Sequence, residues 1–170
     1  MRRGFTRILF LVSVVSGITL LNCGNNPNIP NKPASGSIQG SPFTVQGMIG
    51  EWSPDRLRLS ISLDDFASTC GDTSHIGKPY TEVVVSLPAK KLATGTYEVG
   101  PALTTDSPNV AVGVSQHTLD STGQIQSTAR MMGSGAVQIT SVSKTSVSGG
   151  LSVSMDGITV SGTFTAPICP

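Results

Sequence analysis

Residues 147–168 have the sequence VSGGLSVSMDGITVSGTFTAPI. Apolar residues or glycine occupy every second position on both sides of Asp156-Gly157, and small polar residues fill most positions between them. A period of two is typical of a strand with one buried face and one exposed face. An Asp-Gly pair between two such runs favours a tight hairpin. The stretch therefore predicts two long antiparallel strands, and Gly149-Gly150 predicts a bulge or bend in the first of them.

The same period continues toward the N-terminus. Residues 56–63 (RLRLSISL) alternate strictly, and residues 80–87 contain the β-branched run Val83–Val85, which suits a central strand. Shorter candidate strands lie at residues 96–99, 110–115 and 137–139. No segment keeps a 3.6-residue apolar period. Residues 118–132 are the best helix candidate, although Gly123 and β-branched residues weaken it.

We count about eight or nine strands with turns at short intervals. This number predicts an all-β domain, an antiparallel β-sandwich with a closed β-barrel as the alternative. Both architectures use the same alternation, so the sequence does not separate them.

The first 22 residues have the layout of a signal peptide. Arg2, Arg3 and Arg7 form a positive start, and an apolar segment of 14 residues follows from Ile8 to Leu21. Such a segment reaches about 21 Å as a helix, which is short of a hydrocarbon core of about 30 Å. We therefore expect export rather than a membrane-spanning anchor.

Leu20-Leu21-Asn22-Cys23 resembles the lipobox of bacterial lipoproteins. Leu20 and Cys23 fit that pattern, and Asn22 stands where Gly, Ala or Ser is usual. The resemblance implies a diacylglycerol thioether on the sulfur of Cys23, cleavage before this residue, and two or three acyl chains, such as palmitate, on the mature protein. It also implies a lipid-anchored protein of the bacterial cell envelope. With Gly24 after the cysteine, the outer membrane is the expected site, on a face that the sequence does not identify.

Residues 24–41 are rich in Asn, Pro, Gly and Ser and have little apolar content. Such a composition predicts a flexible tether. The expected organisation is a signal peptide over 1–22, a lipidated cysteine and tether over 23–41, and one all-β domain over 42–170, a length that suits a single core.

Two cysteines remain if Cys23 carries lipid, namely Cys70 and Cys169. An even pair in an oxidising compartment predicts a disulfide, which would fix the penultimate residue of the chain to a loop in its first half. The alternative is a pair of thiols for catalysis or metal binding, but the sequence has no CxxC motif.

Removal of the three N-terminal arginines leaves eight basic against ten acidic residues, a net charge of −2. No basic run is present, so we expect no nucleic-acid partner. The chain has no GxSxG, HExxH or GxxxxGK[ST] motif. We therefore expect a non-enzymatic protein without a cofactor or a metal.

A few polar residues are candidate sites. Asp72 and His75 share a loop, and a metal site there would need further ligands such as Asp64 and Asp65; a solvated loop is the favoured interpretation. Asp64-Asp65 lack the alternating acidic pattern of a calcium loop and are expected in an exposed turn. His117 is expected to be an exposed residue at a strand end.

Trp52 is the one tryptophan among eight aromatic residues. It is a candidate anchor for a ligand or partner, because tryptophan is enriched at binding hot spots. The competing interpretation, which we favour, is packing in or at the rim of the core.

The C-terminal 36 residues, with Ser161-Gly162-Thr163-Phe164 before a terminal cysteine, resemble the closing strand of small β-domains in bacterial lipoproteins. The resemblance implies envelope location and carries no catalytic residue. We expect a binding or structural module whose partners are membrane lipid, through Cys23, and an envelope protein or glycan. The alternatives are a barrel-type carrier of a small apolar ligand and an envelope hydrolase.

Overall fold

The computed structural model describes residues 27–53, 57–71, 77–88, 92–100 and 109–170. These residues contain eleven strands and no helix. The strands are β1 (Ser35–Ile38), β2 (Ser41–Thr44), β3 (Gly47–Trp52), β4 (Arg58–Asp64), β5 (Tyr80–Pro88), β6 (Gly95–Glu98), β7 (Ala111–Leu119), β8 (Ile125–Met131), β9 (Ser134–Val142), β10 (Ser146–Met155) and β11 (Ile158–Pro167).

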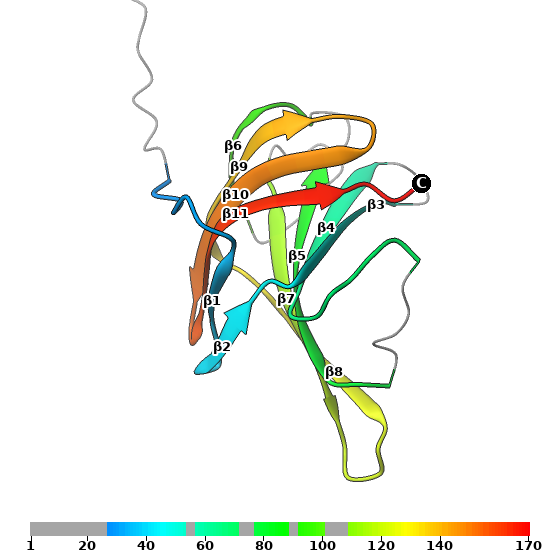
Figure 1. Ribbon diagram of the computed structural model, residues 1–170. Coiled ribbons are helices and arrows are strands. Elements are labelled where there is room, and N and C mark those ends of the chain that lie inside the picture. Colours follow the sequence, from blue (N-terminus) through cyan, green and yellow to red (C-terminus); the bar gives the residue numbers. More distant parts are fainter. Residues whose placement is uncertain (1–26, 54–56, 72–76, 89–91, 101–108) are drawn as a thin grey trace, which may run out of the picture.

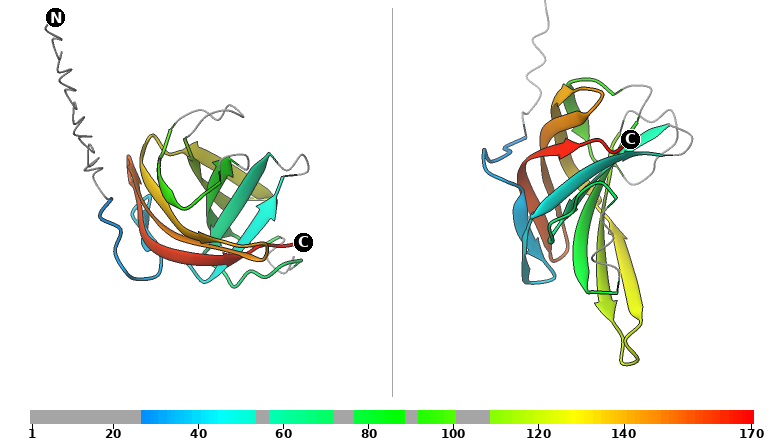
Figure 2. Two further views of the ribbon diagram at one scale, coloured as in Figure 1. Left: turned by 90° about the horizontal axis from the view of Figure 1, so that it is seen from above. Right: turned by 45° about the vertical axis from the view of Figure 1, so that its right-hand side comes forward.

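The strands form two antiparallel sheets (Figures 1 and 2). Sheet A has the order β2-β1-β11-β10-β9-β6, and sheet B has the order β3-β4-β5-β7-β8. The predicted all-β sandwich is confirmed. The alternative of a closed barrel is wrong, because the strands form two sheets that do not close into one continuous sheet. The strands also outnumber the eight or nine that we expected.

The predicted hairpin is the centre of sheet A. Met155 pairs with Ile158, so Asp156 and Gly157 alone form the turn, and Gly157 has a φ of 73°. The predicted irregularity at Gly149 is also present. Ser148 pairs with Ser141 and Gly149 with Ile139, which leaves Thr140 of β9 as the extra residue of a bulge.

Alternation decides which side chains enter the core. Leu59, Ile61 and Leu63 of β4 are completely buried, and so are Val83 and Val85 of β5. Inward-facing residues of sheet A complete the same cluster from the other side, among them Val137, Ile139, Val147, Leu151, Ile158 and Val160. The interior is therefore an apolar layer between two sheets, as expected for aligned sandwiches.

Backbone contacts join the sheets at two places. Gly50 of β3 forms a bridge with Ile168, just after β11, and its carbonyl accepts the Cys169 N–H at 2.7 Å. Val99, after β6, forms a bridge with Val110, before β7. These contacts fix the relative position of the two sheets.

The predicted tether over 24–41 extends too far into the domain. Residues Ser35–Ile38 form β1 between β2 and β11, and Ala34 and Ile38 are buried. Gly36 permits this position, because a Cβ there would lie 1.8 Å from the carbonyl oxygen of Thr159. Two buried side chains and a ladder of backbone hydrogen bonds offset the low apolar content that had suggested a free coil.

The best helix candidate, residues 118–132, is not a helix. It contains the turn of a hairpin and β8, whose residues pair with β7 from Gly113–Met131 to Leu119–Ile125. Polar residues alternate with small and apolar ones in β8, and Gly123 in the turn has a φ of 80°. Pairing along β7 therefore outweighs the weak helical tendency of this segment.

Candidate functional site

The hairpin of β7 and β8 projects from the sandwich beyond the neighbouring strands (Figures 1 and 2). Six of the seven residues of β8 are exposed, and Ile125 is half-buried. The tip of the hairpin lies far from residue 27, where the described N-terminal segment begins (Figure 1). We call β7, β8 and their turn the β7–β8 hairpin, and it is the main candidate site of the molecule.

Asp120 organises the turn of the hairpin. Its Oδ1 accepts the N–H groups of Thr122 and Gln124 at 2.8 and 2.9 Å, and the Thr122 hydroxyl at 2.7 Å. Its Oδ2 accepts the side-chain amide of Gln126 at 3.2 Å. The Asp120 N–H donates to the Gln124 carbonyl at 2.8 Å and closes the turn. These donors favour the charged carboxylate and lower the pKa of Asp120 from 3.8 to about 2, with the hydroxyl of Thr122 as the largest cause.

His117 connects the base of the hairpin to β5. It pairs with Tyr80 in the sheet, and the two rings stack with 4.0 Å between centroids and 9° between planes. Phe66 then meets Tyr80 edge-on at 5.3 Å. The side chain of His117 is 14% exposed. The expectation of an exposed strand-end histidine is therefore wrong, because the aromatic stack covers one face of the ring.

Both ring nitrogens of His117 have polar contacts on the outer face of sheet B. The Ser127 hydroxyl lies 2.7 Å from Nδ1, and Glu82 Oε1 lies 3.4 Å from Nε2. A neutral imidazole with its proton on Nε2 satisfies both contacts, since the hydroxyl then donates to Nδ1 and Nε2 donates to the carboxylate. The side chains of β5, β7 and β8 are thereby joined across three strands.

The carboxylates near this stack affect Tyr80. Burial, followed by the negative charges of Glu82 and Asp64, raises the pKa of Tyr80 above 10.0. Asp64 is 3% exposed and ends β4, which corrects the expectation of an exposed Asp64-Asp65 turn. Asp65 accepts the N–H of Thr81 at 2.9 Å and is half-buried. Both acidic residues thus belong to the packed end of sheet B.

The outer edge of β8 presents backbone groups without a strand partner in the described part of the chain. The Met132 N–H donates to Val112 and the Asp120 N–H to Gln124, which fixes the hydrogen-bonding parity of the β7–β8 ladder. Hydrogen-bonded pairs recur at every second residue of an antiparallel ladder. The even-numbered residues of β8 therefore face β7. The N–H and C=O groups of the odd-numbered residues face outward, namely those of Ile125, Ser127, Ala129 and Met131.

Apolar side chains lie on the same hairpin. Leu119 is 44% exposed and Met131 is 50% exposed, and they are two of the three exposed large apolar residues among those described. By strand parity both belong to the outer face of sheet B, together with Ile125. The hairpin therefore combines an open backbone edge with exposed apolar side chains on one face.

Two hollows lie on sheet A. One, of about 350 Å³, is lined by residues that include Ile29, Gln138, Thr140 and Thr165. The other, of about 510 Å³, is lined by residues that include Lys32, Ser35, Ser154 and Ser161. Hydroxyl and amide groups predominate in both, and the N-terminal segment forms part of each wall. Neither contains the residues of the β7–β8 hairpin.

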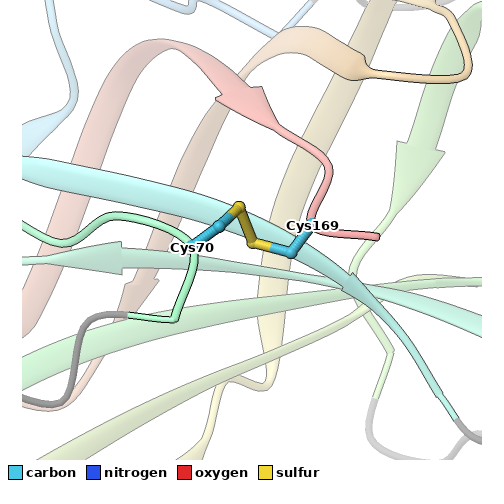
Figure 3. Close-up of a disulfide and its surroundings, with 2 residues drawn as sticks. All are labelled: Cys70 and Cys169. Atoms are coloured by element: carbon cyan, nitrogen blue, oxygen red, sulfur yellow. A yellow bond between two sulfur atoms is a disulfide. The ribbon is translucent and has the colours of Figure 1, made fainter.

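The predicted disulfide between Cys70 and Cys169 is present (Figure 3). It spans 99 positions of sequence and lies next to the Cys169–Gly50 hydrogen bond. Trp52, the candidate anchor, is half-buried and packs against the core. The structure therefore gives both cysteines a structural position, and it places Trp52 at the rim of the core.

Other residues singled out from the sequence lie outside the described part of the chain. These are Cys23 with the signal peptide, and Asp72 and His75 of the considered metal site. Among the described residues, no group of three or more His, Cys, Asp or Glu side chains is placed to hold a metal ion. The described residues also contain no helix long and apolar enough to span a membrane.

The β7–β8 hairpin was missed from the sequence, although two signals point to it. Asp120 and Gly123 are typical turn residues three positions apart, shortly after the predicted strand at residues 110–115. His117 and Ser127 are placed so that a hairpin around that turn brings them opposite each other.

Comparison of the chain with protein-family models, with curated proteins and with solved structures finds no match.

Proposed function

We propose that this chain is an exported, lipid-anchored, non-catalytic module of the bacterial cell envelope, and that it presents the β7–β8 hairpin to a protein partner. The sequence supports export and acylation through residues 1–22 and Cys23. The observation that carries the binding role is the open edge of β8, on a hairpin that projects away from the rest of the fold.

The direction of the hairpin fits an anchored protein. The described chain begins at residue 27 near one end of the molecule, and the hairpin tip lies near the other (Figure 1). With acyl chains on Cys23, the tip faces away from the membrane. Two or more acyl chains give stable anchoring, whereas one gives only marginal binding.

A protein partner fits the edge better than a glycan does. Outward N–H and C=O groups at regular spacing are complemented by a second extended backbone, as in strand addition to a sheet edge. Glycan binding usually relies on stacked aromatic rings, and β8 has none. The alternative of a carrier required a closed barrel, which the two sheets do not form.

The anchor is tested by a Cys23→Ala variant in cells that are fed an alkyne-labelled palmitate. The expected result is complete loss of the acyl label and of the lipid mass on the N-terminal peptide. A Cys70→Ala/Cys169→Ala variant is the control and keeps the label. Labelling that persists without Cys23, or a native protein that retains residues 1–22, contradicts the proposal.

The role of the hairpin is tested by placing a photo-crosslinking amino acid at Leu119 in living cells. The exposed loop residue Lys144, beside β9 and β10, is the control position. We expect a discrete protein adduct from position 119 and none from position 144. Equal or absent crosslinking at the two positions contradicts a binding role for the hairpin, and the mass of the adduct gives the size of the partner.

A second candidate is hydrolysis by acyl transfer. It is favoured by the chain of side-chain contacts from Ser127 through His117 to Glu82. In it, Ser127 Oγ would attack the carbonyl carbon of an ester and pass its proton to His117 Nδ1. The bond between the carbonyl carbon and the alcohol oxygen would break, the alcohol would leave with that proton, and water would then release the acid from Ser127. The position on a flat strand speaks against it, because backbone N–H groups there lie in the sheet plane and do not converge on an oxyanion. A fluorophosphonate probe decides the matter: labelling that is lost in Ser127→Ala supports hydrolysis, and no labelling supports the binding module.

A further inference from the structure

Among the edge strands of the two sheets, β8 stands apart. At the edges of sheet A, β2 and β6 have four residues each, and β2 contains Pro42, which lacks an N–H group. At the other edge of sheet B, β3 meets the end of the chain through Gly50 and Ile168. Short strands, prolines and covering segments are the usual means by which proteins protect sheet edges.

The strand β8 has none of these protections. Its seven residues, IQSTARM, contain no proline, no glycine and no bulge, and they include a single charge, on Arg130. Natural proteins seldom leave a regular edge of this length open, because it pairs readily with another strand. We therefore expect the exposed edge of β8 to pair with another strand.

We infer that a second copy of this chain covers it, through antiparallel pairing of β8 with β8 about a two-fold axis at Thr128. This inference names the partner of the hairpin and so rests on the proposed function. A strand of seven residues that pairs with itself about its central residue overlaps completely. The cross-strand pairs are Ile125–Met131, Gln126–Arg130, Ser127–Ala129 and Thr128–Thr128.

The hydrogen-bond parity agrees with this register. The groups that face outward belong to odd-numbered residues, and the two-fold pairing at Thr128 places odd residues opposite odd residues. Ile125 faces Met131 and Ser127 faces Ala129 as hydrogen-bonded pairs, which gives about eight backbone hydrogen bonds over the whole interface. A register shifted by one pair to centre on Ser127 overlaps over five residues of the strand instead of seven.

The side chains also agree with it. On the outer face, the apolar Ile125 of each copy lies opposite the exposed Met131 of the other. On the opposite face, Arg130 of each copy lies opposite the neutral Gln126 of the other, so the two Arg130 side chains are not paired with each other. Thr128 lies opposite Thr128, which is a favourable cross-strand pair. A register centred on Arg130 would instead place two guanidinium groups side by side.

The symmetric position of Thr128 gives a sharp test. In a Cys23→Ala background, Thr128→Cys is the sole thiol outside the Cys70–Cys169 disulfide. Directly opposed residues in a non-hydrogen-bonded pair have Cα atoms about 4.5 Å apart. We expect the full chain, purified in detergent and oxidised mildly, to form a disulfide-linked dimer. The control Gln126→Cys would face Arg130, with its own counterpart four residues away and beyond disulfide reach.

A charge pair provides the second measurement. In the Thr128→Cys chain, Ile125→Lys with Met131→Lys places like charges opposite each other and should reduce dimer formation at least tenfold. Ile125→Lys with Met131→Glu should restore it, because position 125 of one copy faces position 131 of the other. Within one copy these two positions lie about 20 Å apart along the strand and do not pair.

The outcomes separate the inference from the proposed function. Equal crosslinking of Thr128→Cys and Gln126→Cys, or no crosslinking of either, overturns the self-pairing. So does failure of the Lys/Glu pair to restore it. In those cases a Leu119 adduct of a mass other than two copies still supports the hairpin as a binding element, whereas the absence of any adduct removes the proposed function itself.

Discussion

The imidazole of His117 lies flat against the phenol ring of Tyr80, with 4.0 Å between ring centroids, and this stack is where the β7–β8 hairpin leaves the sandwich. The hairpin is held there by more than its backbone ladder. Ser127 and Glu82 contact the two nitrogens of the same ring. The relationship therefore determines how firmly a projecting element is attached to the core.

Removal of the ring should loosen the base of the hairpin. We expect His117→Ala to lower the free energy of unfolding by about 1–2 kcal/mol, through loss of the stack and its hydrogen bonds. His117→Phe keeps a ring against Tyr80 and should lose less. Urea denaturation of the three proteins measures the difference, and equal stabilities of wild type and His117→Ala would contradict a structural role for the stack.

The turn of the hairpin should respond to acid. The folded pKa of Asp120, about 2, lies below its ordinary value of 3.8. Its contribution to the order of the turn is therefore present above pH 4 and is lost as the pH falls toward 2. The protection of the Thr122 and Gln124 amides against hydrogen exchange, relative to the intrinsic rate at each pH, should fall in that range. In Asp120→Ala this protection should be low at every pH; strong protection in that variant would show that the carboxylate does not hold the turn.

The disulfide should stabilise the end of the chain. Replacement of Cys70 and Cys169 by alanine is expected to cost about 2–4 kcal/mol of unfolding free energy. Local loss should appear first at the Cys169–Gly50 hydrogen bond, because β3 and the end of β11 meet there. Hydrogen exchange at position 169 compared with Leu151, in the middle of β10, checks the order of opening. Uniform acceleration along the domain would argue against a local effect.

The position of β1 is tested at Gly36. An alanine there would place its Cβ 1.8 Å from the Thr159 carbonyl oxygen, so β1 must separate from β11 or unpair. We expect rapid exchange of the Ser35–Ile38 amides and a loss of about 2 kcal/mol or more, as is usual when packed backbone is forced apart. Gly133→Ala is the matched control, since nothing lies within 4 Å of its Cβ. An equally small effect of both substitutions would show that β1 is not part of the packed domain.

The long strands of the core were predictable because one face of each is buried. Leu59, Ile61 and Leu63 alternate with polar residues, and the Asp156-Gly157 turn lies between two runs of the same kind. In such segments burial itself produces the pattern, so the sequence carries it. The pairing of Cys70 with Cys169 followed from counting the remaining cysteines.

The remaining elements lack that pattern for physical reasons. Both faces of β8 are exposed, so no apolar period marks it, and its existence depends on the ladder with β7. The strand β1 is four residues long and buries Ile38 alone of its own side chains. The contacts of His117 join residues 35 and 10 positions apart, and such distances become visible only once strand order is known.

The contact of Ile29 with Gly150 limits how far the domain can lie from a membrane to which Cys23 is anchored. A Cβ on Gly150 would lie 2.6 Å from the Ile29 side chain, so the chain is already fixed to sheet A at that residue. Six residue steps from Cys23 to Ile29 span at most about 20 Å. If Cys23 is acylated as proposed, this short connecting segment keeps the domain within a thin layer above the lipid headgroups. Encounters between two such molecules then occur by lateral diffusion in a plane, where even a weak strand pairing is repeatedly renewed.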